Sequence, residues 1–161
     1  MPATKLRDFL DANNIKYMTI SHSPAYTAQE IAANSHIPGK ELAKTVIVKV
    51  DDYFAMAVLP ASHQVDLHAL KEVTQANSVR LATEAEFMNL FPDCEVGAMP
   101  PFGNLYDMPV FADESLAEDE EIAFNACTHK QLVRLATDDF AYLVRPTVLK
   151  FALRRKRTAA A

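Results

Sequence analysis

The segment from residue 42 to residue 59 constrains the fold more than any other part of the chain. It holds two apolar runs rich in β-branched residues, Leu42 to Val50 and Tyr53 to Leu59, which are joined by Asp51-Asp52. Runs of this composition favour β-strands, and a two-residue acidic link between them is a turn signal. The sequence therefore predicts a β-hairpin, and Pro60 marks its end.

Lys44 lies near the start of the first predicted strand. Because side chains alternate along a strand, Lys44 shares a face with three valines. These are Val46, Val48 and Val50. A lysine in line with valines either stands at the mouth of the strand with its ammonium in water, or lies in a pocket where its charge is used. The pattern alone leaves both alternatives open.

Helical and extended patterns alternate along the rest of the chain. They predict helices over 4–13, 27–33, 66–76, 83–91 and 137–143, further strands over 15–21, 78–82, 108–112, 122–125 and 132–136, and a short basic helix over 147–157. Capping boxes at Thr27-x-x-Glu30 and Thr83-x-x-Glu86 support two of the helices. This mixture predicts one α/β (α+β) domain with a mixed sheet, over residues 1–146, followed by a basic C-terminal tail, 147–161.

Composition and charge limit the class of protein. A chain of 161 residues, half of them apolar and 23% charged, suits one soluble domain. Five of the 16 basic residues fall in the last twelve positions, so the remainder holds 11 basic against 21 acidic residues. An acidic body argues against nucleic-acid binding by the whole surface. The basic end is either a solvated terminus or a contact for phosphates, through Arg154, Arg155, Lys156 and Arg157.

The two cysteines and the N-terminus indicate a compartment. Cys94 and Cys127 lack a CxxC spacing, which predicts buried thiols in a reducing environment rather than a disulfide. Residues 1–5 have no signal-peptide core, and no run approaches the roughly 18 apolar residues of a membrane span. We therefore expect a cytoplasmic protein with no membrane partner. Scattered histidines without zinc-site spacing predict no metal, and nothing in the sequence predicts a cofactor.

A second informative segment runs from Glu95 to Tyr106. It places Gly97 and Gly103 around the pair Pro100-Pro101. Glycine allows close approach by a ligand and proline stiffens its neighbours, so this pattern predicts a stiff loop. The backbone N–H groups expected to face a ligand are those of Gly97, Ala98 and Met99. Such donors suit an ester or carboxylate. The alternative is a rigid connection between a helix and a strand.

Three motifs together resemble the YbaK family of aminoacyl-tRNA deacylases, which includes the editing domain inserted in bacterial prolyl-tRNA synthetases. They are Leu42-Ala43-Lys44-Thr45-Val46, the loop Gly97-x-x-x-Pro101-x-Gly103, and Phe124-Asn125-Ala126-Cys127-Thr128-His129. The resemblance extends from about His22 to Leu143. It implies a single domain with a mixed, partly barrel-like sheet flanked by helices. It also implies hydrolysis, in trans, of the ester that joins a small mischarged amino acid to tRNA.

The resemblance also implies roles for particular residues. Lys44 matches the lysine required for activity, and residues 97–103 match the loop that shapes the amino-acid pocket. The implied substrate-binding residues are Gly97, Ala98, Met99, Pro100, Pro101, Phe102 and Gly103, with His22, Thr27 and His129. We predict that Lys44 acts as a positive charge on the carbonyl or the ribose–phosphate. No Gly-x-Ser-x-Gly elbow is present, and in this family the vicinal ribose hydroxyl assists instead.

The resemblance specifies the reaction better than the amino acid. Relatives specialised for alanyl-tRNA carry a His-Pro pair and a later Asn where this chain has Asn125-Ala126 and His129. Two other functions stay open from the sequence. One is a non-catalytic module that binds tRNA or an aminoacyl ligand, and the other is a hydrolase of other small esters. The implied partners are the aminoacylated 3′ end of tRNA and, as an open alternative, an aminoacyl-tRNA synthetase.

Overall fold

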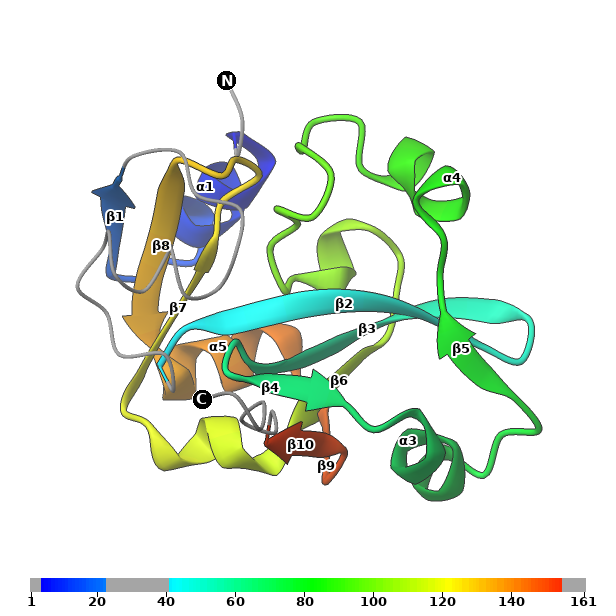
Figure 1. The fold of residues 1–161 in the computed structure, drawn as a ribbon. Helices are drawn as coiled ribbons and strands as arrows, with labels where there is room; N and C mark the ends of the chain where they lie inside the picture. Colours follow the sequence, from blue (N-terminus) through cyan, green and yellow to red (C-terminus); the bar gives the residue numbers. More distant parts are fainter. Residues whose placement is uncertain (1–3, 23–40, 155–161) are drawn as a thin grey trace, which may run out of the picture.

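Three sheets and their flanking helices form the fold in a computed structural model, which describes residues 4–22 and 41–154 (Figure 1). The strands are β1 (Tyr17–Ser21), β2 (Ala43–Val50), β3 (Tyr53–Pro60), β4 (His63–Val65), β5 (Val79–Leu81), β6 (Val110–Asp113), β7 (Glu121–Asn125), β8 (Gln131–Ala136), β9 (Thr147–Leu149) and β10 (Ala152–Arg154). The α-helices are α1 (Thr4–Ala12), α3 (Leu67–Thr74), α4 (Glu84–Phe87) and α5 (Thr137–Val144). Short 3-10 helices are η1 (Met88–Leu90), η2 (Gly103–Leu105) and η3 (Glu114–Glu118).

The predicted hairpin is confirmed and forms the centre of the larger sheet. β2 and β3 pair antiparallel from Ala43↔Pro60 to Val50↔Tyr53. At the turn, Asp51 adopts a left-handed φ of 51°. Its carboxylate accepts the backbone N–H groups of Asn77 and Ser78 at 2.9 and 3.0 Å. The turn is thus tied to the chain that enters β5.

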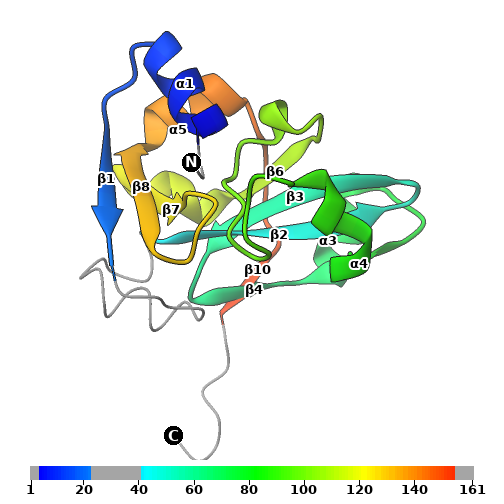
Figure 2. The same cartoon turned by 90° about the horizontal axis from the view of Figure 1, so that it is seen from above.

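The larger sheet is mixed, as the sequence predicted. Its strand order is β5-β2-β3-β6-β9, in which β6 runs parallel to both β3 and β9. A separate antiparallel sheet has the order β1-β8-β7, and β10 pairs with β4. Figure 2 shows the β1-β8-β7 sheet at one end of the long β2–β3 hairpin. The α+β class is confirmed, and the strands of the described residues form no closed barrel.

The β2–β3 hairpin separates two hydrophobic cores because its side chains alternate between its faces. On one face Ile47 and Val58 pack in a cluster that includes Phe102. On the other face Val48 and Leu59 pack in a second cluster, which includes Leu70 of α3 and Phe151. Both faces of the hairpin are therefore buried, which accounts for the nearly continuous apolar sequence of β3.

Side-chain caps mark the start of two helices, and one of them is the capping box predicted at Thr83. Asp66 caps α3 by accepting the N–H of Ala69 at 3.1 Å. The capping box of Thr83 and Glu86 is formed in both directions, although α4 is short and passes into η1. The predicted helix over 27–33 lies outside the described residues. None of the helices in the described ranges has the length and apolar character needed to cross a bilayer.

The helix predicted over 147–157 is wrong, because residues 147–154 form β9 and β10. β9 adds to the edge of the larger sheet beside β6, and β10 pairs with β4. Phe151, between them, is only 1% exposed. Pairing partners far away in the sequence override the local pattern here. The same pairing places His63 in β4.

Asp113 fastens this C-terminal segment to the sheet. The Asp113 residue is only 4% exposed. Its carboxylate accepts the N–H groups of Phe151 and Ala152, each at 2.9 Å, and both the N–H and the hydroxyl of Ser115. Burial raises the pKa of this carboxyl, but the hydrogen bonds from Ser115, Phe151 and Ala152 outweigh burial and hold the pKa below its ordinary value.

Asp113→Ala is expected to lower the free energy of unfolding by about 3 kcal/mol, because it leaves buried N–H donors unsatisfied. Since the folded pKa is depressed, the stabilisation by Asp113 is present above the unfolded pKa of about 3.9 and is lost as the pH falls through the lower folded value. Urea unfolding of the wild type and the variant at neutral and acidic pH measures both effects. Asp52→Ala, which removes an exposed carboxylate, is the control. A wild-type loss on acidification that persists unchanged in Asp113→Ala would contradict the assignment.

Candidate active site

The turn between β7 and β8 is the centre of the candidate site. Ala126 donates its N–H to Gln131 O at 3.1 Å, which closes the turn over residues 126–131. His22, at the end of β1, donates its backbone N–H to Lys130 O at 2.8 Å. Because β1 pairs with β8 up to Ser21↔Gln131, the antiparallel sheet delivers His22 to the same turn that carries His129.

The loop that carries Gly97 is fastened to this turn by main-chain hydrogen bonds. Glu95 donates its N–H to Cys127 O at 2.9 Å, and Cys127 donates its N–H to Ala98 O at 2.9 Å. Within the loop, Ala98 donates its N–H to Glu95 O at 3.0 Å. The two sequence motifs that were predicted to form one site are therefore in direct contact.

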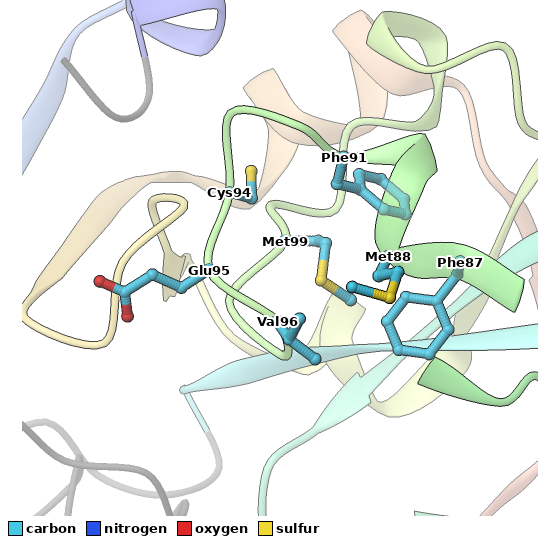
Figure 3. A pocket seen from close by; sticks show the side chains of 7 residues that line it. All are labelled: Phe87, Met88, Phe91, Cys94, Glu95, Val96 and Met99. Carbon is cyan, nitrogen blue, oxygen red and sulfur yellow. The ribbon is translucent and has the colours of Figure 1, made fainter. Parts of the chain in front are cut away.

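His129 links the turn and the loop through its ring and its backbone. The residue is 9% exposed, and its ring Nε2 lies 2.9 Å from Val96 O. A carbonyl oxygen only accepts hydrogen bonds, so Nε2 carries the proton and donates it. The backbone N–H of His129 donates to Glu95 Oε2 at 3.1 Å. In Figure 3 the Glu95 side chain points away from the aromatic side chains of the pocket.

Gly97 lies against the His129 ring with a backbone that favours glycine. Its φ is +86°, and a Cβ at this position would lie 3.6 Å from His129 Cε1. Space is therefore sufficient, and the constraint is conformational. Within the described part of the chain, no hydrogen bond engages the N–H groups of Gly97 and Met99, whereas the N–H of Ala98 is used in the loop. Two of the three predicted donors can therefore face a ligand.

Lys44 lies close to the point where the start of the hairpin meets β7. Leu42 forms a parallel bridge with Ala123 of β7, and Ala123 donates its N–H to Glu41 O at 3.0 Å. From this bridge, β2 continues through the half-buried Lys44. β7 continues to the turn that carries His129. Register pairs Lys44 with Leu59 on one face of the hairpin.

The Gly97 loop packs against the opposite face of the hairpin. Met99 shares a core cluster with Ile47 and Val58. Phe102 is fully buried in the same cluster, where its ring centroid lies 5.4 Å from that of Phe124. Of the predicted pocket residues, the structure thus places Phe102 in the core. Pro100, Pro101 and Gly103 are also buried.

A shallow apolar pocket lies beside the loop (Figure 3). Its lining combines the loop with α4 and η1, and consists of Phe87, Met88, Phe91, Cys94, Glu95, Val96 and Met99. Phe87, Met88 and Phe91 were not among the site residues predicted from the sequence. Their position just before the loop could have suggested that they lie near it. The helical pattern, however, did not indicate which of these side chains face the loop.

The prediction of two separate buried thiols is wrong, because Cys94 and Cys127 form a disulfide. The residues are 33 positions apart, and the hydrogen bonds between loop and turn bring their Cα atoms to 4.1 Å. Ligand atoms of Asp93, Cys94 and Cys127 lie within 4.8 Å of one another. Metal ligation requires thiolates, so the bonded sulfurs cannot serve as ligands in this state.

The other predicted contacts lie at or beyond the limits of the described residues. Thr27, Arg155, Lys156 and Arg157 are outside them. Arg154 ends β10, where its backbone pairs with His63.

Curated relatives match part of this chain. The proline–tRNA ligase of Bacillus cytotoxicus is 34% identical over 89 residues, which cover 55% of this chain and 16% of the ligase. The proline–tRNA ligase of Bacillus cereus strain AH187 is 30% identical over the same shares of the two chains. The present chain thus spans only about a sixth of the length of these enzymes.

Solved structures and a family model cover more of the chain. The crystal structure of hypothetical protein APE2540 aligns with a TM-score of 0.82 at 21% identity, over 92% of this chain and 99% of that one. A proposed trans-editing enzyme for prolyl-tRNA synthetase aligns with a TM-score of 0.80 at 19% identity, over 94% and 96%. Both show that the fold is shared. The model of the aminoacyl-tRNA editing domain matches residues 22–143, and this chain therefore belongs to that family.

Proposed function

We propose that this protein is a trans-editing aminoacyl-tRNA deacylase that hydrolyses the ester of a small amino acid mischarged on tRNA. The observation that carries the proposal is the junction of the Gly97 loop with the His129 turn, beside the start of the strand that bears Lys44. Membership of the editing-domain family supports the same reaction class. We place the activity in the cytoplasm, with tRNA as partner and a synthetase as the source of the mischarged substrate.

The site suits ester hydrolysis through charge and hydrogen-bond donors. Water adds to the ester carbonyl carbon, and the carbonyl oxygen becomes an oxyanion. The bond to the ribose oxygen then breaks, and that oxygen takes up a proton. In this proposal the ammonium of Lys44 acts as a positive charge on the carbonyl or on the ribose–phosphate, and the N–H groups of Gly97 and Met99 hold the amino acid and the attacking water. A single preorganised donor contributes about 10²–10³ in rate.

His129 is a positioning residue in this mechanism. Its Nε2–H is engaged with Val96 O, so this atom does not take a proton from water. Its ring instead supports Gly97, and its backbone holds Glu95. The resemblance to the deacylase family implies that the vicinal ribose hydroxyl assists the attack.

The apolar side chains beside the loop are of a kind that contacts a small apolar or weakly polar side chain. Phe87, Phe91 and Met99 form an apolar wall of limited depth. An apolar pocket distinguishes side chains that differ by one methylene by only ~1–3 kcal/mol. We therefore expect activity on one or two small amino acids, drawn from alanine, serine, threonine and cysteine, with partial tolerance of the others.

A panel of mischarged tRNAs, prolyl and non-prolyl, tests this function directly. The expected result is release of one or two small amino acids well above the spontaneous rate, with correctly charged tRNAs largely spared. Tight binding of tRNA without release across the panel would favour the binding module. Equally fast hydrolysis of small esters that lack tRNA would favour a general esterase.

A further inference from the structure

The disulfide between Cys94 and Cys127 joins the two segments that make up the candidate site. Cys94 stands at the start of the loop that carries Gly97, and Cys127 lies in the turn that carries His129. Cys94 is next to Glu95, which the backbone of His129 holds. Cys127 is two residues before His129 itself. A change at the sulfur atoms therefore acts on the relative placement of loop and turn.

Cys127 has a backbone conformation that its surroundings impose. Its φ is 64°, in the left-handed region that side chains with a Cβ rarely adopt. Such a conformation costs about 1–3 kcal/mol and persists only where the surroundings fix it. Here the N–H of Cys127 is bonded to Ala98 O, its carbonyl accepts from Glu95 N, and its side chain is bonded to Cys94. The disulfide is one of three bonds that hold Cys127 in this form.

On reduction the two sulfurs must move apart, by rotation of the side chains or by movement of the backbone. Bonded sulfurs lie about 2.05 Å apart, whereas non-bonded heavy atoms need on the order of 3.5–4.0 Å. The Cα atoms are only 4.1 Å apart, and Cys127 is 1% exposed. The neighbouring residues Glu95, Val96 and Gly97 are exposed, so the loop yields more easily than the packed turn.

A hydroxyl group lies beside both sulfur atoms. Tyr106 Oη is 3.5 Å from Cys94 Sγ and 3.8 Å from Cys127 Sγ, and 3.3 Å from each carboxylate oxygen of Asp93. Burial, together with the negative charge of Asp93, raises the pKa of the Tyr106 phenol, so the O–H stays protonated and can donate. Its single O–H donates to the Asp93 carboxylate, and its oxygen can accept a hydrogen bond from a thiol formed at either sulfur.

We propose that the Cys94–Cys127 disulfide is a reversible redox link that controls the editing site: the oxidised form holds the Gly97 loop on the His129 turn, and the reduced form releases it. The consequence for the deacylation rate rests on the function proposed above. The link itself does not depend on that function.

The chemistry is thiol–disulfide exchange with a dithiol reductant. A thiolate of the reductant attacks Sγ of Cys94, the more exposed sulfur, and Cys127 leaves as a thiolate that is then protonated. The second thiol of the reductant attacks the mixed disulfide and frees Cys94. The dithiol loses two electrons and two protons and becomes a disulfide, and the protein gains two thiols. Hydrogen peroxide reverses the change by accepting two electrons and forming two waters.

The first test counts thiols. Full-length protein is treated with peroxide or with dithiothreitol, denatured, alkylated with iodoacetamide and weighed by mass spectrometry. The expected result is no alkylated cysteine in the oxidised sample and two in the reduced sample. Two alkylated cysteines after peroxide treatment would overturn the proposal.

The second test compares deacylation rates in the two states. Reduction is expected to lower kcat/KM at least about ten-fold, since a displacement of about 1 Å in a site can cost ~10²-fold. Re-oxidation is expected to restore the rate. Cys94→Ser should keep the low rate under both treatments, and Cys94→Ala serves if the serine variant does not fold. Equal wild-type rates in the oxidised and reduced states would overturn the proposal.

Hydrogen exchange separates this inference from the proposed function. The N–H groups of Glu95 and Cys127 bridge loop and turn, so their exchange should be faster in the reduced protein. If no tRNA is hydrolysed but exchange responds to reduction, the proposed function fails and the redox link stands. If exchange is unchanged although the disulfide has been broken, the link does not hold the loop and the inference fails.

Discussion

Lys44→Ala is expected to lower kcat/KM for deacylation by at least about 100-fold while the protein stays folded. Loss of one group that stabilises a developing oxyanion typically costs about 10²–10³ in rate. The side chain is half-buried at the junction of β2 and β7, where Leu42 and Ala123 bridge the two strands. Its truncation removes a charge but no large part of either core, so the unfolding transition should shift little.

Lys49→Ala is the matched control for this experiment. Lys49 belongs to the same strand as Lys44 but lies on the opposite face, with its Nζ 5.5 Å from the centroid of the Phe54 ring. Its loss should leave deacylation within about two-fold of the wild type, because surface substitutions away from a site usually have small effects. Deacylation assays on the substrate identified with the tRNA panel, together with thermal unfolding of both variants, give the comparison. Release that survives in Lys44→Ala would preserve the reaction and exclude the proposed role of the lysine.

Gly103→Ala is expected to lower the free energy of unfolding by about 3 kcal/mol or more. A Cβ on Gly103 would lie 2.3 Å from Met108 O and 2.6 Å from Val110 Cγ2. The carbonyl is main chain, and it is held in place because Met108 also donates its N–H to Gly103 O at 3.0 Å. Over-packing of a tight site commonly costs about 1–3 kcal/mol, and a fixed backbone neighbour places this site at the upper end.

Gly97→Ala provides the contrast, because the obstacle there is conformation and not space. The Cβ would meet His129 Cε1 at an ordinary 3.6 Å, but φ is +86°. Strain of this kind costs about 1–3 kcal/mol. We expect a smaller loss of stability than for Gly103→Ala and a clear loss of activity, since the N–H of residue 97 would be reoriented. Urea unfolding of both variants measures the order, and a Gly103→Ala variant as stable as the wild type would contradict the packing argument.

Local sequence information was sufficient for the elements whose partners are close in the chain. The β2–β3 hairpin has both strands and its turn within one segment, so composition and turn chemistry specify it. The capping box of Thr83 and Glu86 likewise fixes where α4 begins. The C-terminal strands were missed for the opposite reason, because β9 and β10 depend on β6 and β4.

The sequence by itself determined the hairpin and the resemblance of the motifs to an editing domain, because each is a property of residues that are neighbours or share a fixed spacing. Only the tertiary structure decided which motifs meet. It joined the Gly97 loop to the His129 turn, placed Phe102 in the core and brought Phe87 and Phe91 to the pocket. It also paired Cys94 with Cys127 across 33 residues. Such contacts depend on the register and packing of distant strands, which no local pattern encodes.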